Sequence, residues 1–289
     1  MRSFATLGAA HGPTALFVLL WSSGALFARW GLDHASAFVF LSLRFALALA
    51  VLLAIGAWRG RWLPRPGTRR RVAATGALLV GCYSVTYLLA LDHGVTPGVL
   101  ATLLGAQPIL TLALTERPLS PRRLGGLALA LAGLALVVFD SLAAARFGWT
   151  GLAFALASLA CMTVGTLLQK GSDQAPADVL PLQYGVSLLI CLAVLPTAPM
   201  RVEWSPGLLV TVGWLALVIS VAATLLLYRL IRQGNVVDVS SLFYLVPGGT
   251  ALLDWMVFGH RMAPIALGGL GAVVAGLVLV LRTPAKPPA

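Results

Sequence analysis

Long apolar stretches alternate with short polar connections along the whole chain. A helix needs about 20 apolar residues to cross a bilayer, and ten runs come close to that length. These runs are Pro13–Leu32, Ser36–Ala57, Arg71–Leu91, Val95–Thr115, Arg122–Phe139, Gly148–Gln169, Val179–Leu195, Pro206–Tyr228, Asn235–Phe258 and Ala263–Leu281. No connection is long enough to form a separate domain. The pattern predicts an all-α polytopic membrane protein with ten transmembrane helices.

The composition supports a membrane location. Of the 289 residues, 59% are hydrophobic and only 10% are charged, with a mean hydropathy of +0.94. A soluble protein needs a larger charged shell than this. The net charge of +11 does not indicate nucleic-acid binding, because most arginines lie in short connections between apolar runs. The first run is also too long for the hydrophobic region of a cleavable signal peptide.

The distribution of lysine and arginine predicts the orientation. With the N-terminus inside, the inner segments hold fifteen basic residues: Arg2, Arg59, Arg61, Arg65, Arg69, Arg70, Arg71, Arg117, Arg122, Arg123, Lys170, Arg229, Arg232, Arg282 and Lys286. The outer segments hold four, namely Arg29, Arg146, Arg201 and Arg261, and Arg44 lies within a span. Positively charged residues concentrate on the cytoplasmic side of membrane proteins. Both termini are therefore expected in the cytoplasm.

The chain contains one plan twice. An apolar run reaches Pro108 and is followed by a helix that opens at Gly125-Gly126, and a similar run reaches Pro247 before a helix that opens at Gly268-Gly269. Five spans in each half place the second half in the membrane with the opposite orientation. The sequence therefore predicts two inverted five-helix repeats, at 1–140 and 147–283, with a substrate site near the midplane between them.

Several motifs resemble those of a known family. Trp21-Ser22-Ser23-Gly24, the later pair Arg44-Phe45, the late prolines, and Ala275-Gly276 in a glycine-rich last helix are similar to the EamA repeat of the drug/metabolite transporter superfamily. Within it, the chain most resembles bacterial YddG-type exporters, and this resemblance implies export of aromatic and other neutral amino acids. The Gly-Glu-Arg typical of the family is Thr115-Glu116-Arg117 here in the first repeat and Gly259-His260-Arg261 in the second, so the pattern assigns no role to Glu116 or His260.

Polar and aromatic residues recur at helical spacing within several runs. Such residues are costly in lipid and should face a cavity or a partner helix. The candidate substrate contacts are Trp21, Tyr83, Tyr87, Gln107, Met162, Gln169, Tyr228 and Tyr244. A mostly apolar wall with a few hydrogen-bonding groups suits an amphipathic small molecule. The alternative is that these polar groups bond to neighbouring helices or to their own backbone.

Prolines and charged residues within the runs allow further hypotheses. Pro108 and Pro247 are candidate hinges for alternating access, or else static bends used for packing. Arg44 either pairs with a substrate carboxylate, pairs with a structural partner, or reaches toward an interface. Asp238 and Asp254 lie near the ends of one run, so either could take up a proton, yet no carboxylate lies clearly at the midplane.

The glycines and alanines of the fifth and tenth runs predict close helix packing, with a dimer contact as the alternative. Among these small residues are Gly125, Gly126, Ala130, Gly133, Gly268, Gly269, Ala272 and Gly276. Cys82, Cys161 and Cys191 lie inside apolar runs and indicate packing, and no ligand spacing predicts a metal or a cofactor.

The sequence therefore predicts an amino-acid exporter of the bacterial inner membrane, which works by alternating access and acts as a monomer or weak dimer. Its expected partners are a small-molecule substrate and the lipid bilayer, without nucleic acid. Export of other small metabolites or amphipathic drugs is the nearest alternative, and a membrane scaffold subunit is a second. An enzyme is not expected, because the scattered residues His11, His34, His93 and His260 form no catalytic cluster. Proton coupling, exchange and facilitated diffusion all remain open.

Overall fold

The computed structural model describes residues 4–95, 97–116, 119–139, 143, 148–258 and 263–283. Within them all regular elements are helices, and the only β-type pairing is an isolated bridge between Ala35 and Val202. The first half contains α1 (Phe4–His34), α2 (Ala37–Trp58), α3 (Arg69–Gly76), η1 (Ala77–Cys82), α4 (Tyr83–Asp92), α5 (Pro97–Leu104), α6 (Gln107–Thr115) and α7 (Pro121–Val137). The second half contains α9 (Trp149–Lys170), α10 (Pro176–Val194), η2 (Leu195–Thr197), α11 (Pro206–Gly213), η3 (Trp214–Ala223), α12 (Thr224–Gln233), α13 (Val236–Ser241), η4 (Leu242–Tyr244), α14 (Leu245–Phe258) and α15 (Pro264–Arg282).

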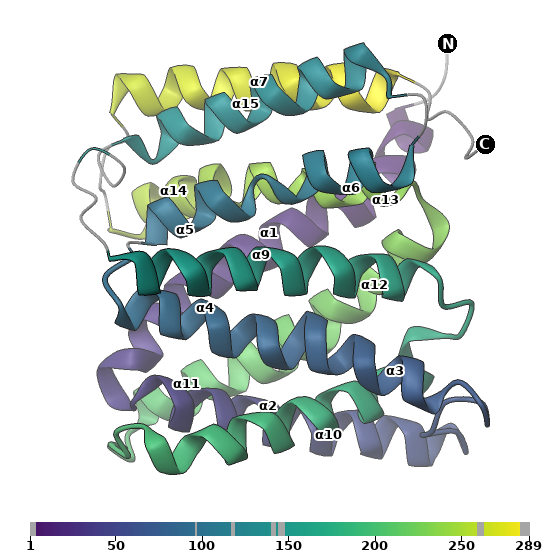
Figure 1. Cartoon of the computed structure of the whole chain (residues 1–289), viewed down its shortest axis with the longest axis vertical. Helices are drawn as coiled ribbons and strands as arrows, with labels where there is room; N and C mark the ends of the chain where they lie inside the picture. The colour runs from purple at the N-terminus through teal and green to yellow at the C-terminus, as the bar shows by residue number, and fades with distance from the viewer. Residues whose placement is uncertain are drawn as a thin grey trace.

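Most of these helices run alongside one another in a single elongated bundle, and α1 begins at the same end at which α15 ends (Figure 1). Seven continuous helical stretches in the described residues are long and apolar enough to cross a membrane. They are Gly12–His34, Ala37–Trp58, Arg69–Asp92, Trp149–Lys170, Pro176–Thr197, Pro206–Gln233 and Pro264–Arg282, and Val99–Thr115 is a shorter apolar helix. The expected all-α, multi-pass membrane fold is therefore confirmed.

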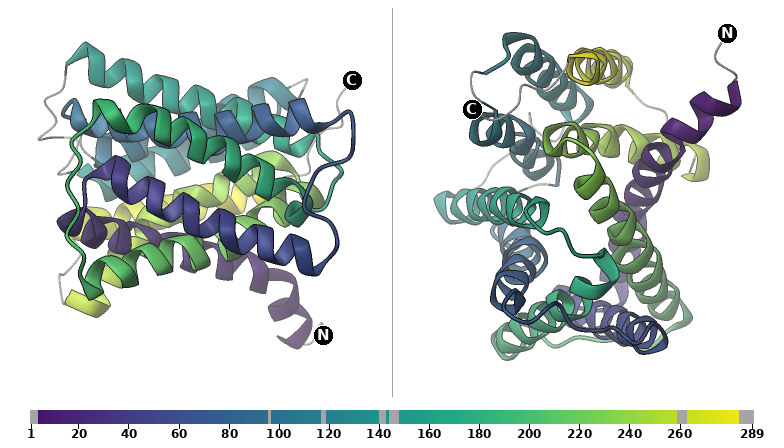
Figure 2. Two further views of the ribbon diagram at one scale, coloured as in Figure 1. Left: turned by 90° about the horizontal axis from the view of Figure 1, so that it is seen from below. Right: turned by 90° about the vertical axis from the view of Figure 1, so that its right-hand side faces the viewer.

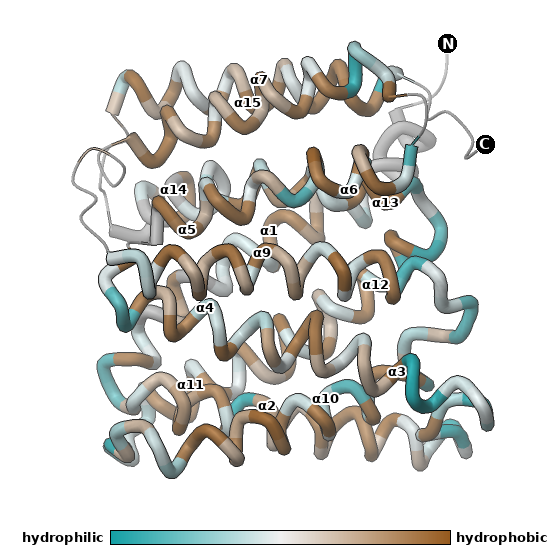
Figure 3. Tube along the Cα trace, in the orientation of Figure 1, coloured by the Kyte–Doolittle hydropathy of each residue, from teal (hydrophilic) through white to brown (hydrophobic). Residues whose placement is uncertain are grey.

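Hydrophobic residues cover the middle of the helices, and hydrophilic residues gather at the connections at both ends of the bundle (Figure 3). Large apolar side chains also point outward, such as Leu189 at 67% exposure and Leu209 at 64%. In lipid such side chains are solvated as well as in a protein core, and helices satisfy their own backbone groups. Trp58 and Trp149 are strongly exposed at helix ends, where indole rings favour the membrane interface.

Corresponding spans of the two halves share the same backbone irregularities. Residues 105–106 separate α5 from α6, and the 3-10 turn η4 separates α13 from α14. The segment Ala77–Cys82 is π-helical, as is Trp214–Ala223 in the other half. Interrupted helices at matching positions of two repeats are typical of binding sites in transporters, and π-helical turns are frequent at functional sites.

The small residues of α7 and α15 bring these two helices into close contact. A Cβ added to Gly133 would lie 2.6 Å from the carbonyl oxygen of Gly269, and one added to Gly126 would lie 2.8 Å from that of Gly276. The pair lies side by side at one edge of the bundle (Figure 2, right). Both glycine faces are thus used inside the chain, as the packing hypothesis expects.

Connections from the two halves also pair with one another. At one end of the bundle, the amide of Ser36 donates to the carbonyl of Arg201, and the amide of Glu203 donates to that of His34. At the other end, the buried Gln174 accepts a hydrogen bond from the amide of Arg65 and donates to Thr68. Each pairing joins the first repeat to the second.

Candidate functional site

A cavity of about 80 Å³ lies between the two halves of the chain. Five of the eight candidate contacts line it: Trp21, Tyr83, Gln107, Met162 and Tyr228. The wall also includes Arg44, for which the sequence allowed a substrate carboxylate as partner, and residues not proposed as contacts, among them Phe45, Thr166, Tyr184, Ser240 and Phe243. A void needs roughly 10–15 Å³ by this measure to hold one water, so the cavity has room for several waters or a small solute.

One side of the cavity is aromatic. The rings of Phe17, Trp21 and Phe243 form a mutual cluster with centroid separations of 5.2–5.4 Å, including two edge-to-face contacts. Phe243 belongs to η4, so the interruption of the span directs this ring into the cluster. Aromatic rings in such contacts stabilise each other by about 0.5–1.5 kcal/mol beyond their burial. This part of the wall is therefore apolar and pre-organised.

Arg44 brings a positive charge to the cavity. Its Nε donates to the Ser220 hydroxyl at 2.8 Å, and its guanidinium carbon lies 5.8 Å from the centroid of the Phe45 ring. No carboxylate among the described residues lies within ion-pair distance of this guanidinium. Ser220 fixes one edge of the group and leaves its two terminal nitrogens for another acceptor.

Gln107 and the Tyr244 hydroxyl both lie beside the break in the interrupted span of the first repeat. Gln107 is buried and donates from Nε2 to the Thr166 hydroxyl at 3.3 Å. The hydroxyl of Tyr244 donates to the carbonyl of Gly105 at 2.5 Å, which satisfies a backbone group at the break. Tyr244 therefore joins the two interrupted spans and does not line the cavity.

The candidate hinges lie beside these interruptions. Pro108 occupies the first turn of α6, where its missing N–H removes no helical hydrogen bond. The break itself is at residues 105–106, just before Pro108. Pro247 likewise follows the 3-10 turn η4 and lies in the first turn of α14. Each proline lies in the first turn of a helix that follows a break.

Gln169 and Gln183 form a buried hydrogen-bonded layer with Tyr228. The Tyr228 hydroxyl donates to Oε1 of Gln183 at 2.7 Å, and Nε2 of Gln183 donates to Oε1 of Gln169 at 3.0 Å. Tyr228 is the only member of the layer that lines the cavity, so the candidate contact Gln169 lies behind the wall. In the sequence, the only signal for Gln183 is its place in a polar stripe at helical spacing.

The remaining candidates have separate surroundings. The ring of Tyr87 is tilted against that of Tyr83, with centroids 5.9 Å apart, and it packs against a cluster that includes Val99 and Ala155 outside the cavity. The side chain of Asp254 lies outside the described residues, as do His260 and Arg261. Among the described residues, no group of three or more His, Cys, Asp or Glu side chains could hold a metal ion.

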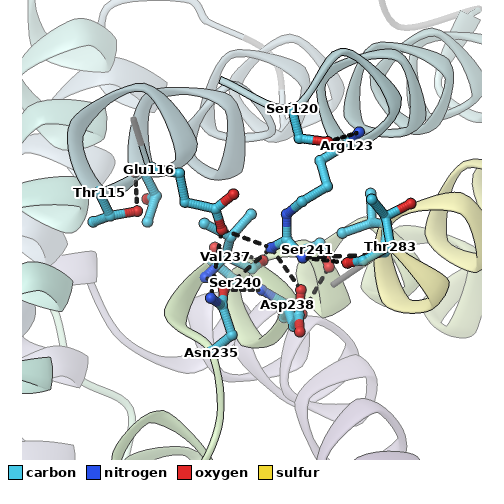
Figure 4. Close-up of polar contacts among 12 residues, drawn as sticks. Thr115, Glu116, Ser120, Arg123, Asn235, Val237, Asp238, Ser240, Ser241 and Thr283 are labelled. Carbon is cyan, nitrogen blue, oxygen red and sulfur yellow. Dashed lines mark hydrogen bonds and ion pairs between the residues drawn. The ribbon is translucent and has the colours of Figure 1, made fainter. Parts of the chain in front are cut away.

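A second polar centre lies at the end of the bundle where α6 ends and α7 begins (Figure 4). Arg123 is fully buried, and its Nη2 lies 3.1 Å from Glu116 Oε1 and 2.8 Å from Asp238 Oδ1. The same guanidinium donates to Asn235 Oδ1 at 3.2 Å and to the carbonyl of Thr283 at 3.0 Å. The residues come from both repeats. Asp238, a candidate proton site, is therefore an ion-pair partner.

Burial changes the pKa of Glu116 in this second polar centre. Desolvation raises the pKa of Glu116 above its ordinary value of 4.5, although Arg123 and the hydrogen bond from Asn235 act in the opposite direction. The second oxygen of Glu116 and the Nε of Arg123 have no hydrogen-bond partner in the described structure. The Asn235 side chain also accepts from the amides of Val237 and Asp238, and so caps α13.

Comparison with known proteins places this architecture. The sequence profile of the EamA-like transporter family matches residues 14–139 and again residues 149–282. The chain belongs to the EamA-like transporter family. A solved crystal structure, described only as that of a protein, is similar to it with a TM-score of 0.76 and 20% identity, over 96% of this chain and 99% of the other. That likeness supports the fold alone. The search of curated proteins finds no significant match.

Membership in the EamA-like family makes the chain a transporter and a multi-pass membrane protein. It also agrees with the resemblance carried by the tryptophan, arginine and glycine motifs. Of the cavity residues, Arg44 was recognisable from the sequence as a charge within a span. Tyr184 and Phe243 carry no comparable signal, because an aromatic residue in an apolar run is most often part of the core.

Proposed function

We propose that this EamA-family protein exports neutral and aromatic amino acids across the bacterial inner membrane. It does so through ten spans arranged as two inverted repeats, with both termini in the cytoplasm. The observation that supports this best is the cavity between the halves, where an aromatic wall faces a guanidinium without a carboxylate partner among the described residues. A site of this kind matches a solute with an apolar side chain and a carboxylate.

Arg44 binds the substrate carboxylate in this proposal. An arginine presents parallel N–H groups that match the two carboxylate oxygens, and such charge-assisted bonds are stronger than neutral ones. Ser220 holds Nε in place, which limits the conformational entropy lost on binding. The substrate ammonium group lies near Gln107, Tyr83 or the aromatic faces, where amide oxygens and rings attract a cation.

The cavity supports alternating access between the two sides. Its lining extends from the middle of the bundle toward Thr166 and Ile231, near the ends of α9 and α12. The layer of Gln169, Gln183 and Tyr228 lies in that direction, and we propose that it opens when the substrate leaves or enters. Movement at the interruptions beside Pro108 and Pro247 accompanies this opening.

A small apolar carboxylic acid without an amino group is the second candidate substrate. The described cavity lining contains no acidic side chain to attract an ammonium group, which favours this alternative. Lipophilic cationic drugs fit less well, because Arg44 would repel them. A non-transporting scaffold role would leave the cavity without a ligand.

Uptake into proteoliposomes tests the proposal. We expect saturable uptake of labelled phenylalanine, threonine and methionine that unlabelled amino acids compete for, measured with and without an inward-acid pH gradient. Arg44→Gln should raise KM or abolish uptake, whereas the exposed control Arg229→Gln should leave it unchanged. Equal uptake by Arg44→Gln and wild type would refute the carboxylate role.

The same assay separates the candidates. Uptake of phenylpyruvate in place of phenylalanine would favour the carboxylic-acid alternative. Absence of any uptake by correctly folded protein, together with no ligand-dependent thermal shift, would favour the scaffold. A response to the pH gradient would distinguish proton coupling from exchange or facilitated diffusion.

A further inference from the structure

A second, open hollow of about 460 Å³ lies at the end of the bundle, apart from the transport cavity. It is formed by the connection between α2 and α3 and by the beginning of α10. Three arginines line it, Arg61, Arg65 and Arg69, together with Gln174 and Asp178. No step of the proposed transport cycle uses these groups.

The charge around this hollow is not balanced. Arg65 pairs with Asp173 at 3.0 Å, and the neighbouring Arg59 pairs with Asp178 at 3.0 Å. Among the described residues, neither Arg61 nor Arg69 lies within ion-pair distance of a carboxylate. Both side chains are exposed, so two guanidiniums remain available to an anion.

The backbone that carries these arginines is held in place. The buried Gln174 accepts from the amide of Arg65 at 2.8 Å and donates to the hydroxyl of Thr68 at 3.0 Å. Pro64 and Pro66 restrict the same connection, and Gly67 takes a φ of +85°, a left-handed conformation that favours glycine. A fixed connection of this kind has little backbone entropy left to lose on binding.

Inverted symmetry supplies an internal comparison. The counterpart of this connection in the second repeat is the segment between α10 and α11. That segment forms hydrogen bonds with residues 34–36 of the first repeat, just as the connection between α2 and α3 forms them with Gln174 of the second. Residues 59–71 contain six arginines, whereas residues 195–205 contain one arginine and one glutamate. The counterpart therefore forms with a single arginine, so folding of such a connection does not require six.

Exposed apolar side chains lie at the end of α2 and in the connection that follows it, and one of them, Leu63, lines the hollow. Trp58 is 90% exposed, Trp62 is 50% exposed and Leu63 is 38% exposed. Tryptophan favours the boundary between acyl chains and head groups. We infer that the hollow lined by Arg61, Arg65 and Arg69 binds the phosphate head group of an anionic phospholipid, whose acyl chains lie against Trp58, Trp62 and Leu63. Clusters of basic residues at helix ends attract anionic lipids in this way.

Native mass spectrometry of the full chain in detergent tests this inference. Phosphatidylglycerol or cardiolipin is titrated against phosphatidylcholine, and we expect the anionic lipids to bind preferentially. The double variant Arg61→Gln/Arg69→Gln should weaken their binding about 25-fold, since each basic residue near a surface contributes about a fivefold gain. The control Arg70→Gln/Arg229→Gln removes the same charge from exposed residues outside the hollow and should retain wild-type binding.

Three outcomes would overturn the inference. Equal weakening in both double variants would show attraction by net charge alone. Absence of a preference for anionic lipids over phosphatidylcholine would remove the head-group site. Full competition by inorganic phosphate at the concentration of the lipid would point to a site for a free anion. Thermal unfolding followed by tryptophan fluorescence confirms that both variants are folded, and none of these readouts depends on transport.

Discussion

Replacing Arg123 by methionine removes the charge at the centre of the cluster that joins the two repeats. The substitution leaves Glu116, with a side chain only 3% exposed, without its ion-pair partner, while Asp238 at 30% can still reach water. It also leaves the carbonyl of Thr283 and the side-chain oxygen of Asn235 without this donor. The cost should therefore arise mainly from Glu116 and the carbonyl of Thr283, because Asn235 Oδ1 still accepts from the amides of Val237 and Asp238.

The expected loss is about 3–5 kcal/mol, the range found when one partner of a buried ion pair is removed. In domains of 150–250 residues, each kcal/mol shifts Tm by about 2–4 °C, which gives a decrease of about 6–20 °C. Tryptophan fluorescence during heating in detergent measures this shift, and the chain has eight tryptophans. Unfolding of membrane proteins is often irreversible, so all variants must be heated at one rate.

Two comparisons make the reasoning refutable. Arg122→Met removes an exposed arginine one residue away and should change Tm by no more than a degree or two. Glu116→Gln leaves the pair between Arg123 and Asp238 intact and should cost much less than Arg123→Met. A Tm of Arg123→Met within 2 °C of wild type, or equal costs for the arginine and glutamate variants, would show that the cluster does not tie the repeats together.

Three further predictions concern packing, the glutamine layer and pH. Gly133→Ala should lower stability by about 1–3 kcal/mol, because its Cβ would meet the Gly269 carbonyl. Gly125→Ala on the same helix adds a Cβ that meets nothing within 4 Å, so this variant should be tolerated. Equal Tm values for the two variants would contradict this. Tyr228→Phe leaves Gln183 Oε1 without its donor and should cost about 1–3 kcal/mol and alter uptake. The comparison for stability is Tyr184→Phe, because the Tyr184 hydroxyl makes no hydrogen bond in the described structure. The raised pKa of Glu116 means that the folded state binds more protons between pH 4.5 and its folded pKa, so this residue's contribution to stability falls as pH rises through that window. The difference in Tm between wild type and Glu116→Gln, measured across pH, should show this slope, and a flat difference would argue against it.

The transmembrane pattern was predictable because it depends on local properties of the chain. The length of an apolar run and the bilayer thickness together define a span, and the described helices overlap the runs read from the sequence. The repeat was visible for the same reason, since matching prolines and glycines recur in both halves. The interruptions at residues 105–106 and at η4 lie close to Pro108 and Pro247, the prolines proposed from the sequence as hinges or static bends.

Helical spacing identifies the polar face of a span, but it does not identify what that face meets. Gln169 and Tyr244 share such faces with cavity residues, yet one contacts Gln183 and the other reaches the carbonyl of Gly105, 139 positions away in sequence. The partners of Arg44 and Arg123 are equally remote: Arg44 meets Ser220, and Arg123 meets Asp238.

The sequence by itself thus determined the membrane class, the positions of the helices and the presence of two repeats, because hydrophobicity and length act along the chain. Only the tertiary structure decided which five of the eight candidate contacts line a cavity and which side chains brace its wall. It also decided that Asp238 belongs to a buried ion-pair cluster. The physical reason is that these outcomes depend on helix rotation and on contacts between distant segments, and neither is encoded in the periodicity of a single helix.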